Sequence, residues 1–175
     1  LQQHWVAPNK DAILDFLRQR GVRLASHDDA TEAHVGEAIA DGASIAEFPT
    51  TAEAAAAAHR QGLAVLMGAP NVVRGVSHSG NISARAVARA GHLDILSSDY
   101  VPASLLAAAF ALTGGEGGLT LPEAVATVTA NPARAVGLDD RGAIAPGLRA
   151  DLVRVRLIDG QPVVRAVWRT GERVV

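Results

Sequence analysis

Residues 50–71, with the sequence TTAEAAAAAHRQGLAVLMGAPN, decide the fold class of this chain. Thr50 and Glu53 have the spacing of a helix capping box, and the alanine-rich segment after them favours a helix that ends at Gly62. Residues 63–67 then form a nearly continuous apolar run, which is typical of a strand buried on both faces of a parallel sheet. A helix followed by such a strand is the repeating unit of α/β proteins.

The same pattern occurs in the segments on either side. A glycine ends each helical segment and a short apolar run follows it; the runs are residues 22–25, 43–46, 63–67 and 93–96. We expect Asn9 and Asp29 to cap the first two helices. Further helices are predicted over residues 82–90, from Pro102, and over 122–129 and 132–136. Repeated helix–strand units predict a parallel sheet with right-handed crossovers.

The pattern changes after Gly137. The turn-forming sequences DRG and PG follow at residues 140–142 and 146–147, and helical periodicity stops. Residues 152–156 and 163–168 alternate in polarity, which predicts antiparallel strands. The sequence therefore predicts a β/α domain over residues 1–137 and a small β segment over residues 138–175.

Composition excludes several classes of protein. The chain has 175 residues, a net charge of −2 and no cysteine, so disulfides, thiolate metal sites and cysteine nucleophiles are excluded. The charge balance argues against a nucleic-acid partner, and no apolar run reaches the roughly 20 residues that cross a bilayer, so we expect no membrane association. The lack of cysteine is in keeping with the cytoplasmic location that we expect.

Unusual polar residues follow each predicted strand. Because the carboxyl ends of parallel strands meet at one rim, we expect His27, Glu47, Asn71 and Asp99 to gather there. Imidazole and carboxylate groups suit a divalent metal ion. A purely structural interpretation is also open, because a histidine at a strand end often only forms a hydrogen bond and Asp99 can cap the next helix. The structural interpretation is harder to apply to Glu47, because burying a carboxylate without a partner costs free energy.

The loop after the third strand can bind phosphate. Arg74, Ser77 and His78 lead directly into a predicted helix, and a helix start with Gly, Ser and Arg is suited to anions. The alternative is a surface loop in which Asn81 caps the helix. In the next loop, Tyr100 can contact a substrate or simply pack. The chain has no Walker-type or GxGxxG loop. The other histidines are interpreted as surface or structural residues: His4, His34, His59 and His92.

Five segments occur in an order that is similar to a known family: LASHDDAT at 24–31, IAEFPTT at 45–51, MGAPN at 67–71, SHSGN at 77–81 and LSSDYVP at 96–102. Together they resemble the carboxyl-terminal half of the α-D-ribose 1-methylphosphonate 5-triphosphate diphosphatase family. That family belongs to the amidohydrolase superfamily and serves the carbon–phosphorus lyase pathway of phosphonate use. The segment GAIAPGLRADL at 142–152 resembles a superfamily pattern that marks the return to a small β domain.

The resemblance implies that the chain is α/β and holds the last four units of an amidohydrolase-type (β/α)₈ barrel, plus a short carboxyl-terminal β segment. It implies a hydrolase that cleaves the 5-triphosphate to the 5-phosphate and pyrophosphate, with water activated by a divalent metal such as zinc or manganese. His27 and Asp99 match metal-binding positions, and Asp99 would also take the proton of the water. Glu47, the second catalytic candidate, stands where many relatives have histidine. The residues expected to contact the phosphorylated substrate are Asn71, Arg74, Ser77 and His78.

A full (β/α)₈ barrel takes roughly 250 residues, so we expect this chain to be part of a longer protein and to have weak or no activity by itself. A half barrel would expose two sheet edges and an apolar inner face, which predicts a homo-oligomer. Two alternatives stay open. One is an amidohydrolase that acts on carbon–nitrogen bonds, and the other is a non-catalytic, oligomerising half barrel.

Overall fold

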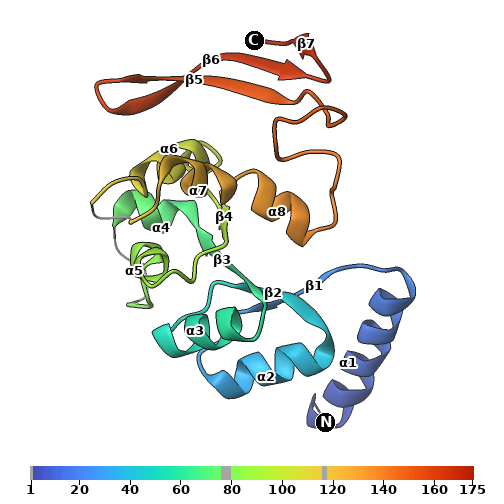
Figure 1. Ribbon diagram of the computed structural model, residues 1–175. Coiled ribbons are helices and arrows are strands. Elements are labelled where there is room, and N and C mark those ends of the chain that lie inside the picture. Colours follow the sequence, from blue (N-terminus) through green and yellow to red (C-terminus); the bar gives the residue numbers. More distant parts are fainter. Residues whose placement is uncertain (1, 76–79, 116–117) are drawn as a thin grey trace.

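Two sheets organise the chain (Figure 1). The first has four parallel strands in the order β1–β2–β3–β4, and the second has three strands in the order β5–β6–β7. The computed structural model describes residues 2–75, 80–115 and 118–175, with side chains from Trp5 onward. The predicted parallel α/β sheet and the predicted antiparallel strands are both confirmed.

The order of the strands in the parallel sheet equals their order in the sequence. These strands are β1 (Leu24–His27), β2 (Ala43–Glu47), β3 (Ala64–Gly68) and β4 (Ile95–Ser97). The helices before and between them are α1 (Gln2–Gln19), α2 (Glu32–Asp41), α3 (Ala52–Arg60), α4 (Ala69–Arg74) and α5 (Ala84–Arg89). After β4 come α6 (Ser104–Ala111), α7 (Leu121–Ala126) and α8 (Ala130–Ala135). The second sheet consists of β5 (Leu152–Ile158), β6 (Gln161–Arg169) and β7 (Glu172–Arg173).

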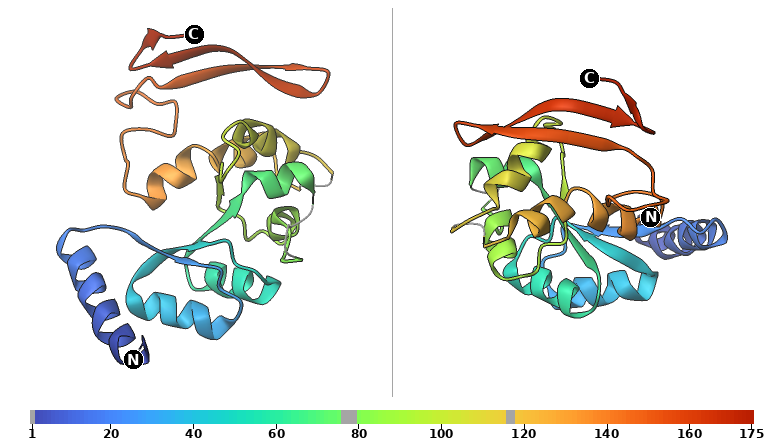
Figure 2. Two further views of the ribbon diagram at one scale, coloured as in Figure 1. Left: turned by 180° about the vertical axis from the view of Figure 1, so that it is seen from behind. Right: turned by 45° about the horizontal axis from the view of Figure 1, so that its top comes forward.

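One face of the parallel sheet carries the core. Ala46 and Val65 are register partners, as are Met67 and Leu96, and all four side chains are buried. They belong to one core cluster that also contains the buried alanines of α3. α2 and α3 lie side by side against this part of the sheet (Figure 2). Because neighbouring strand residues alternate between faces, the residues between these core positions point to the opposite face.

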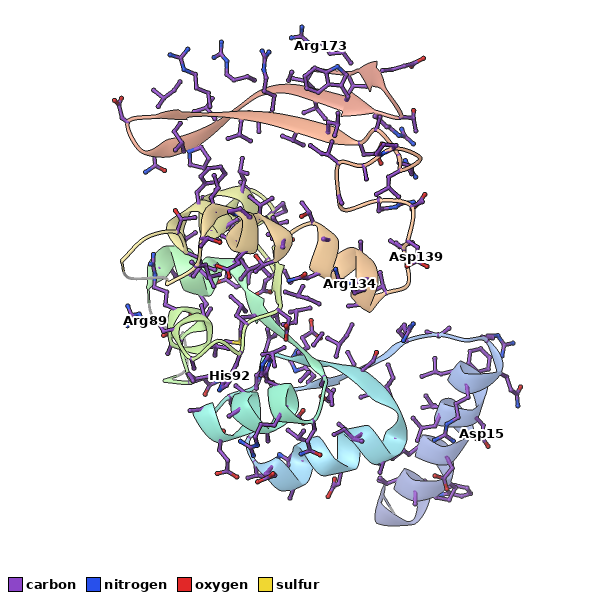
Figure 3. The ribbon with its side chains drawn as sticks, viewed as in Figure 1. Asp15, Arg89, His92, Arg134, Asp139 and Arg173 are labelled. Atoms are coloured by element: carbon purple, nitrogen blue, oxygen red, sulfur yellow. The ribbon has the colours of Figure 1, made fainter. Side chains whose placement is uncertain are left out.

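The second sheet lies over α6, at the end of the molecule away from α1 (Figures 1 and 2). Ala166 of β6 is buried, whereas Arg173 of β7 lies on the outer side (Figure 3). Asp139 lies just beyond α8, at the start of the linker between the two sheets. Within the three described ranges, no helix combines the length and apolar character that a membrane crossing requires.

Two predicted helix caps are wrong. Asn9 lies inside α1, which begins at Gln2 and continues through Pro8. Thr31, not Asp29, caps α2, and its side chain accepts a hydrogen bond from the backbone N–H of His34. The reason is that the buried Asp29 carboxylate is held by the Ser26 hydroxyl and points back to β1.

The predicted capping box at Thr50 and Glu53 is also wrong. Thr51 caps α3, and the Glu53 carboxylate instead accepts a hydrogen bond from the backbone N–H of Glu32, 3.1 Å away. Packing of α2 beside α3 supplies this competing donor. A complete capping box occurs at the start of α7, between Thr120 and Glu123.

The capping box of α7 predicts an acid-sensitive helix start. Hydrogen bonds from the side chain and backbone of Thr120 lower the pKa of Glu123 from its ordinary value of 4.5. Because the folded pKa lies below the unfolded one, this stabilisation is present above about pH 4.5 and is lost as the pH falls through the folded pKa. We expect Glu123→Gln to flatten the acidic part of the stability profile, measured by urea unfolding. Glu172→Gln in β7 is the control, and equal flattening by both variants would contradict the prediction.

Candidate functional site

The carboxyl ends of β1 to β4 form one rim of the parallel sheet. His27 ends β1 and Glu47 ends β2, and the two are direct register partners, so both side chains leave the same face of the sheet. The backbone N–H of Asp28 donates to the carbonyl oxygen of Glu47 at 3.0 Å, which ties the two strand ends together. The rim therefore places an imidazole beside a carboxylate on neighbouring strands.

Three rim residues have a left-handed backbone. The φ angles are 61° at Asp28, 54° at Phe48 and 49° at Asp99. This region is uncommon for residues other than glycine and is unfavourable for a bulky aromatic residue. Such positions cost about 1–3 kcal/mol each and are concentrated at functional sites. Their occurrence after β1, β2 and β4 supports this edge of the sheet as the functional one.

Phe48 is a rim residue that the sequence reasoning missed. Its ring meets the His27 imidazole edge to face, with ring centroids 5.4 Å apart and an interplanar angle of 76°. Over β3, a Cβ built on Gly68 would lie 3.7 Å from Phe48 Cε1 and 3.4 Å from Asp99 Oδ2. The Phe48 ring and the Asp99 carboxylate thus both approach Gly68. The available signal was an aromatic residue directly after a strand, next to Glu47.

His27 is oriented from two sides. Its Nδ1 lies 3.1 Å from Asp28 Oδ2, and the Phe48 ring contacts the imidazole edge to face. The pair with Asp28 is more than half exposed, so it adds little to stability. A carboxylate on one ring nitrogen is, however, the arrangement that orients the other nitrogen toward a ligand.

No described residue engages the side chain of either candidate catalytic carboxylate. Neither Glu47 nor Asp99 has a side-chain hydrogen bond or ion pair with any residue in the described ranges. Glu47 is half-buried and Asp99 is exposed. The alternative that Asp99 caps the next helix is wrong, because α6 begins at Ser104, after the N-cap Ala103. Desolvating a carboxylate without a partner is unfavourable, which argues against a purely structural role for Glu47.

The candidate phosphate-binding residues differ in how the rest of the fold uses them. The Asn71 side-chain oxygen accepts a hydrogen bond from the backbone N–H of Ala84 at 2.9 Å, so it holds the start of α5. Arg74, the last residue of α4, is exposed, and its Cζ lies 5.5 Å from the centroid of the Tyr100 ring. Ser83, not Asn81, caps α5. Ser77 and His78 lie outside the described residues.

The described part of the chain does not provide a complete metal site. Across residues 2–75, 80–115 and 118–175, no group of three or more His, Asp or Glu side chains is arranged to hold a metal ion. His27 and Glu47 are neighbours on β1 and β2, whereas Asp99 follows β4, at the other edge of the sheet. The donors on the described part of this chain are therefore too few by themselves to hold a metal ion.

Hydrogen bonds from the loop after β2 fix the loop after β1. The backbone N–H of Thr50 donates to the Asp29 carbonyl oxygen at 2.8 Å. Thr51 Oγ1 donates to the Ala30 carbonyl oxygen at 2.7 Å and accepts from the Ala54 backbone N–H at 3.0 Å. One hydroxyl thus caps α3 and also joins the two loops.

Thr51→Ala should lower the free energy of unfolding by about 1–2 kcal/mol, because it removes both hydrogen bonds of the hydroxyl. Urea denaturation measures this loss. Thr51→Ser keeps the hydroxyl and should recover most of the stability. An alanine variant as stable as the parent chain would show that the hydroxyl stabilises neither the helix nor the loop.

A parallel β/α sheet with His, Glu and Asp at the carboxyl ends of its strands, followed by a small antiparallel sheet, defines an α/β protein whose candidate functional residues lie on that rim. More specifically, the chain belongs to the amidohydrolase family, whose model matches residues 8–175.

Two curated relatives illustrate this membership. The chain is 54% identical to alpha-D-ribose 1-methylphosphonate 5-triphosphate diphosphatase of Escherichia coli (strain K12), over 99% of this chain and 46% of that protein. It is 34% identical to imidazolonepropionase of Deinococcus deserti, over 93% of this chain and 44% of that protein. The chain therefore spans about half the length of the curated relatives it matches.

Solved structures show the same fold. The amidohydrolase from Thermotoga maritima MSB8 superposes with a TM-score of 0.66 at 22% identity, over 87% of this chain and 43% of that chain. The A. niger ochratoxinase superposes with a TM-score of 0.65 at 21% identity, over 94% of this chain and 44% of that chain. At these identities the similarity concerns the fold alone.

Proposed function

We propose that this chain is part of a metal-dependent hydrolase of phosphonate metabolism. The reaction is cleavage of α-D-ribose 1-methylphosphonate 5-triphosphate to the 5-phosphate and pyrophosphate. The observation that carries the proposal is the 54% identity, over 99% of the chain, to a protein named for this diphosphatase activity. We assign the reaction to the cytoplasm, in keeping with a chain that contains no cysteine.

The proposal includes an architecture for the whole protein. Residues 1–137 would supply the last four β/α units of a (β/α)₈ barrel, and residues 138–175 would belong to a small β domain. The parallel sheet with its strands in sequence order supports this assignment. So does the length of the relatives, because the chain covers 46% of the Escherichia coli protein.

Each rim residue has a proposed role. Asp99 accepts the proton of the attacking water, since its exposed carboxylate is not engaged by any described residue. Glu47 is the second catalytic carboxylate, beside His27 on the same face. Arg74 neutralises phosphate charge, because a guanidinium can donate to two phosphate oxygens at once. The remaining proposed substrate contacts are Asn71, through its amide nitrogen, and Ser77 and His78.

The metal in this proposal is a divalent ion such as zinc or manganese. His27 and Asp99 are the ligands that we assign to this chain, and further ligands would come from outside it. The described residues alone do not form a complete donor set. We therefore expect the 175-residue chain to be weakly active or inactive when it is separated from the rest of its enzyme.

Carbon–nitrogen hydrolysis is the second candidate. A match of 34% identity to imidazolonepropionase and one of 39% over 90 residues to dihydroorotase favour it. Arg74 distinguishes the two candidates. A guanidinium on the rim is suited to a triphosphate, whereas a neutral amide has no charge for it to neutralise.

The experiment that tests the proposal is product analysis with an intact protein of the length of its relatives, of which this chain covers 46% in the Escherichia coli protein. Phosphorus NMR should show pyrophosphate and the 5-phosphate formed in equal amounts. Release of orthophosphate, or no turnover of the triphosphate beside turnover of a cyclic amide, would contradict the proposal.

We also propose that the isolated chain forms a homo-oligomer. β1 is an edge strand of the parallel sheet, and the nearby α1 exposes Trp5, Ile13 and Phe16, each by more than half. Edge strands and exposed apolar surface favour association. Light scattering at micromolar concentration should therefore give a mass of at least two chains, and a monodisperse monomer would refute the proposal.

A further inference from the structure

We propose that Tyr100 is a positioning residue for an oligophosphate: its ring holds the Arg74 guanidinium at the rim of the sheet, where the guanidinium receives the phosphate chain. This inference rests on the proposed function and deepens it, because it adds a residue that selects the charged part of the substrate. Three features of the molecule support it. They are the contact of Arg74 with the ring, the Arg74 hydrogen-bond donors that no described residue occupies, and the hydrogen-bonded backbone beside Arg74 and beside Tyr100.

The geometry of the pair is that of a cation–π interaction. Arg74 Cζ lies 5.5 Å from the centroid of the Tyr100 ring, within the roughly 6 Å over which such attraction acts. The two residues come from neighbouring units, at the end of α4 and in the loop after β4. The ring therefore joins two rim loops without using any hydrogen-bond donor of the arginine.

The unoccupied donors separate Arg74 from the arginines that form ion pairs in the described part of the chain. Arg74 has no ion pair or side-chain hydrogen bond with any residue in the described ranges. In contrast, several arginines elsewhere each pair with a carboxylate; they are Arg18, Arg60, Arg141 and Arg149. A carboxylate would neutralise the guanidinium and occupy its donors, whereas an aromatic ring supports it and leaves the donors for an anion.

The backbone on each side of the pair is fixed. Gly75 ends α4 with φ 81°, and its N–H donates to the Asn71 carbonyl oxygen at 3.0 Å. On the other side, the Val101 N–H donates to the Ser98 carbonyl oxygen at 3.0 Å, which closes a turn around Tyr100. Only the side chains remain free to adjust, and 56% of Tyr100 is exposed. An exposed ring beside a cation whose hydrogen-bond donors no described residue occupies is better explained by a ligand than by packing.

The position also matches the proposed chemistry. Tyr100 directly follows Asp99, the proposed proton acceptor, so phosphate bound by Arg74 would contact the loop that carries the reacting group. The ligand chemistry is a chain of phosphates with several negative charges, either free or attached to a sugar. A single orthophosphate has fewer oxygens to share among the donors and should bind more weakly.

Tyr100 is the only tyrosine of the chain, which gives a direct test. Ring-labelled tyrosine produces one set of aromatic NMR signals, and these can be followed while the 175-residue chain is titrated with inorganic triphosphate at constant ionic strength. We expect a saturable shift with triphosphate and a Kd about tenfold weaker for orthophosphate. Arg74→Gln should abolish the saturable shift, whereas the control Arg60→Gln, on α3, should not.

Variants of the ring separate positioning from folding. Tyr100→Phe keeps the aromatic face and should bind triphosphate like the parent chain by calorimetry. Tyr100→Leu should weaken the Kd about five- to tenfold, because it removes the support of the guanidinium. In the intact protein, Tyr100→Leu should raise KM for the sugar triphosphate with a smaller change in kcat, and Tyr100→Phe should restore KM.

The outcomes distinguish this inference from the proposed function. Unshifted Tyr100 signals, or equal Kd values for Tyr100→Leu and Tyr100→Phe, would overturn the inference even if the intact protein releases pyrophosphate. Triphosphate binding that depends on Arg74 and Tyr100, in an intact protein that does not turn over the sugar triphosphate, would support the inference and refute the proposed function.

Discussion

Replacing Asp99 with asparagine should lower pyrophosphate release by the intact protein about 10²- to 10⁴-fold, the range that a positioned general base contributes. The exposed carboxylate is not engaged by any described residue, so the substitution removes a proton acceptor and no described structural contact. The substituted side chain would also fit the backbone, because asparagine tolerates the left-handed region that Asp99 occupies at φ 49°. Steady-state kinetics should show the loss in kcat, while urea unfolding should show unchanged stability.

Asp159 provides the matched control for this experiment. It has nearly the same backbone conformation, with φ 50°, but lies between β5 and β6 in the second sheet. Asp159→Asn should leave kcat unchanged. If Asp99→Asn keeps more than about one tenth of the activity, Asp99 is not the general base, and Glu47→Gln becomes the variant to examine next.

The fold follows from local sequence more directly than the helix ends do. Apolar runs after glycines predict all four parallel strands, because the interior strands of such a sheet need little besides apolar side chains. The expected burial on both faces is wrong for the edge strand β1, whose residues are half-buried or exposed. Helix caps depend on what a polar side chain finds in three dimensions. Asp29 meets the Ser26 hydroxyl and Glu53 meets the backbone of the neighbouring α2, so neither caps as its spacing suggests. Those partners come from packing, which a local pattern does not describe.

The candidate site is predictable to the same limited extent. Strand ends place His27 and Glu47 on one rim, since parallel strands in register share their faces. The position of Phe48 is not predictable in this way, because an aromatic residue after a strand is normally interpreted as core. The contact between Arg74 and Tyr100 joins the end of α4 to the loop after β4, and no short-range sequence pattern links the two residues.

Gly142→Ala should be the most destabilising small substitution in the linker between α8 and β5. Gly142 has φ 92°, and an added Cβ would lie 2.8 Å from Ala130 Cα and 3.0 Å from the Thr129 carbonyl oxygen. These are backbone atoms at the start of α8 and cannot rotate away. We expect the free energy of unfolding to fall by about 2–5 kcal/mol, the sum of left-handed strain and overpacking.

Comparison with Gly147→Ala separates the strain of the left-handed backbone from the overpacking. Gly147 lies in the same linker with φ 87°, but an added Cβ would meet nothing within 4 Å. This variant should therefore lose only the conformational part, about 1–2 kcal/mol. The difference between the two variants in urea unfolding measures the close approach of the linker to α8, which fixes where the second sheet begins. Equal losses would mean that the linker moves away from α8 at little cost, and that the contact at Gly142 does not hold the second sheet in place.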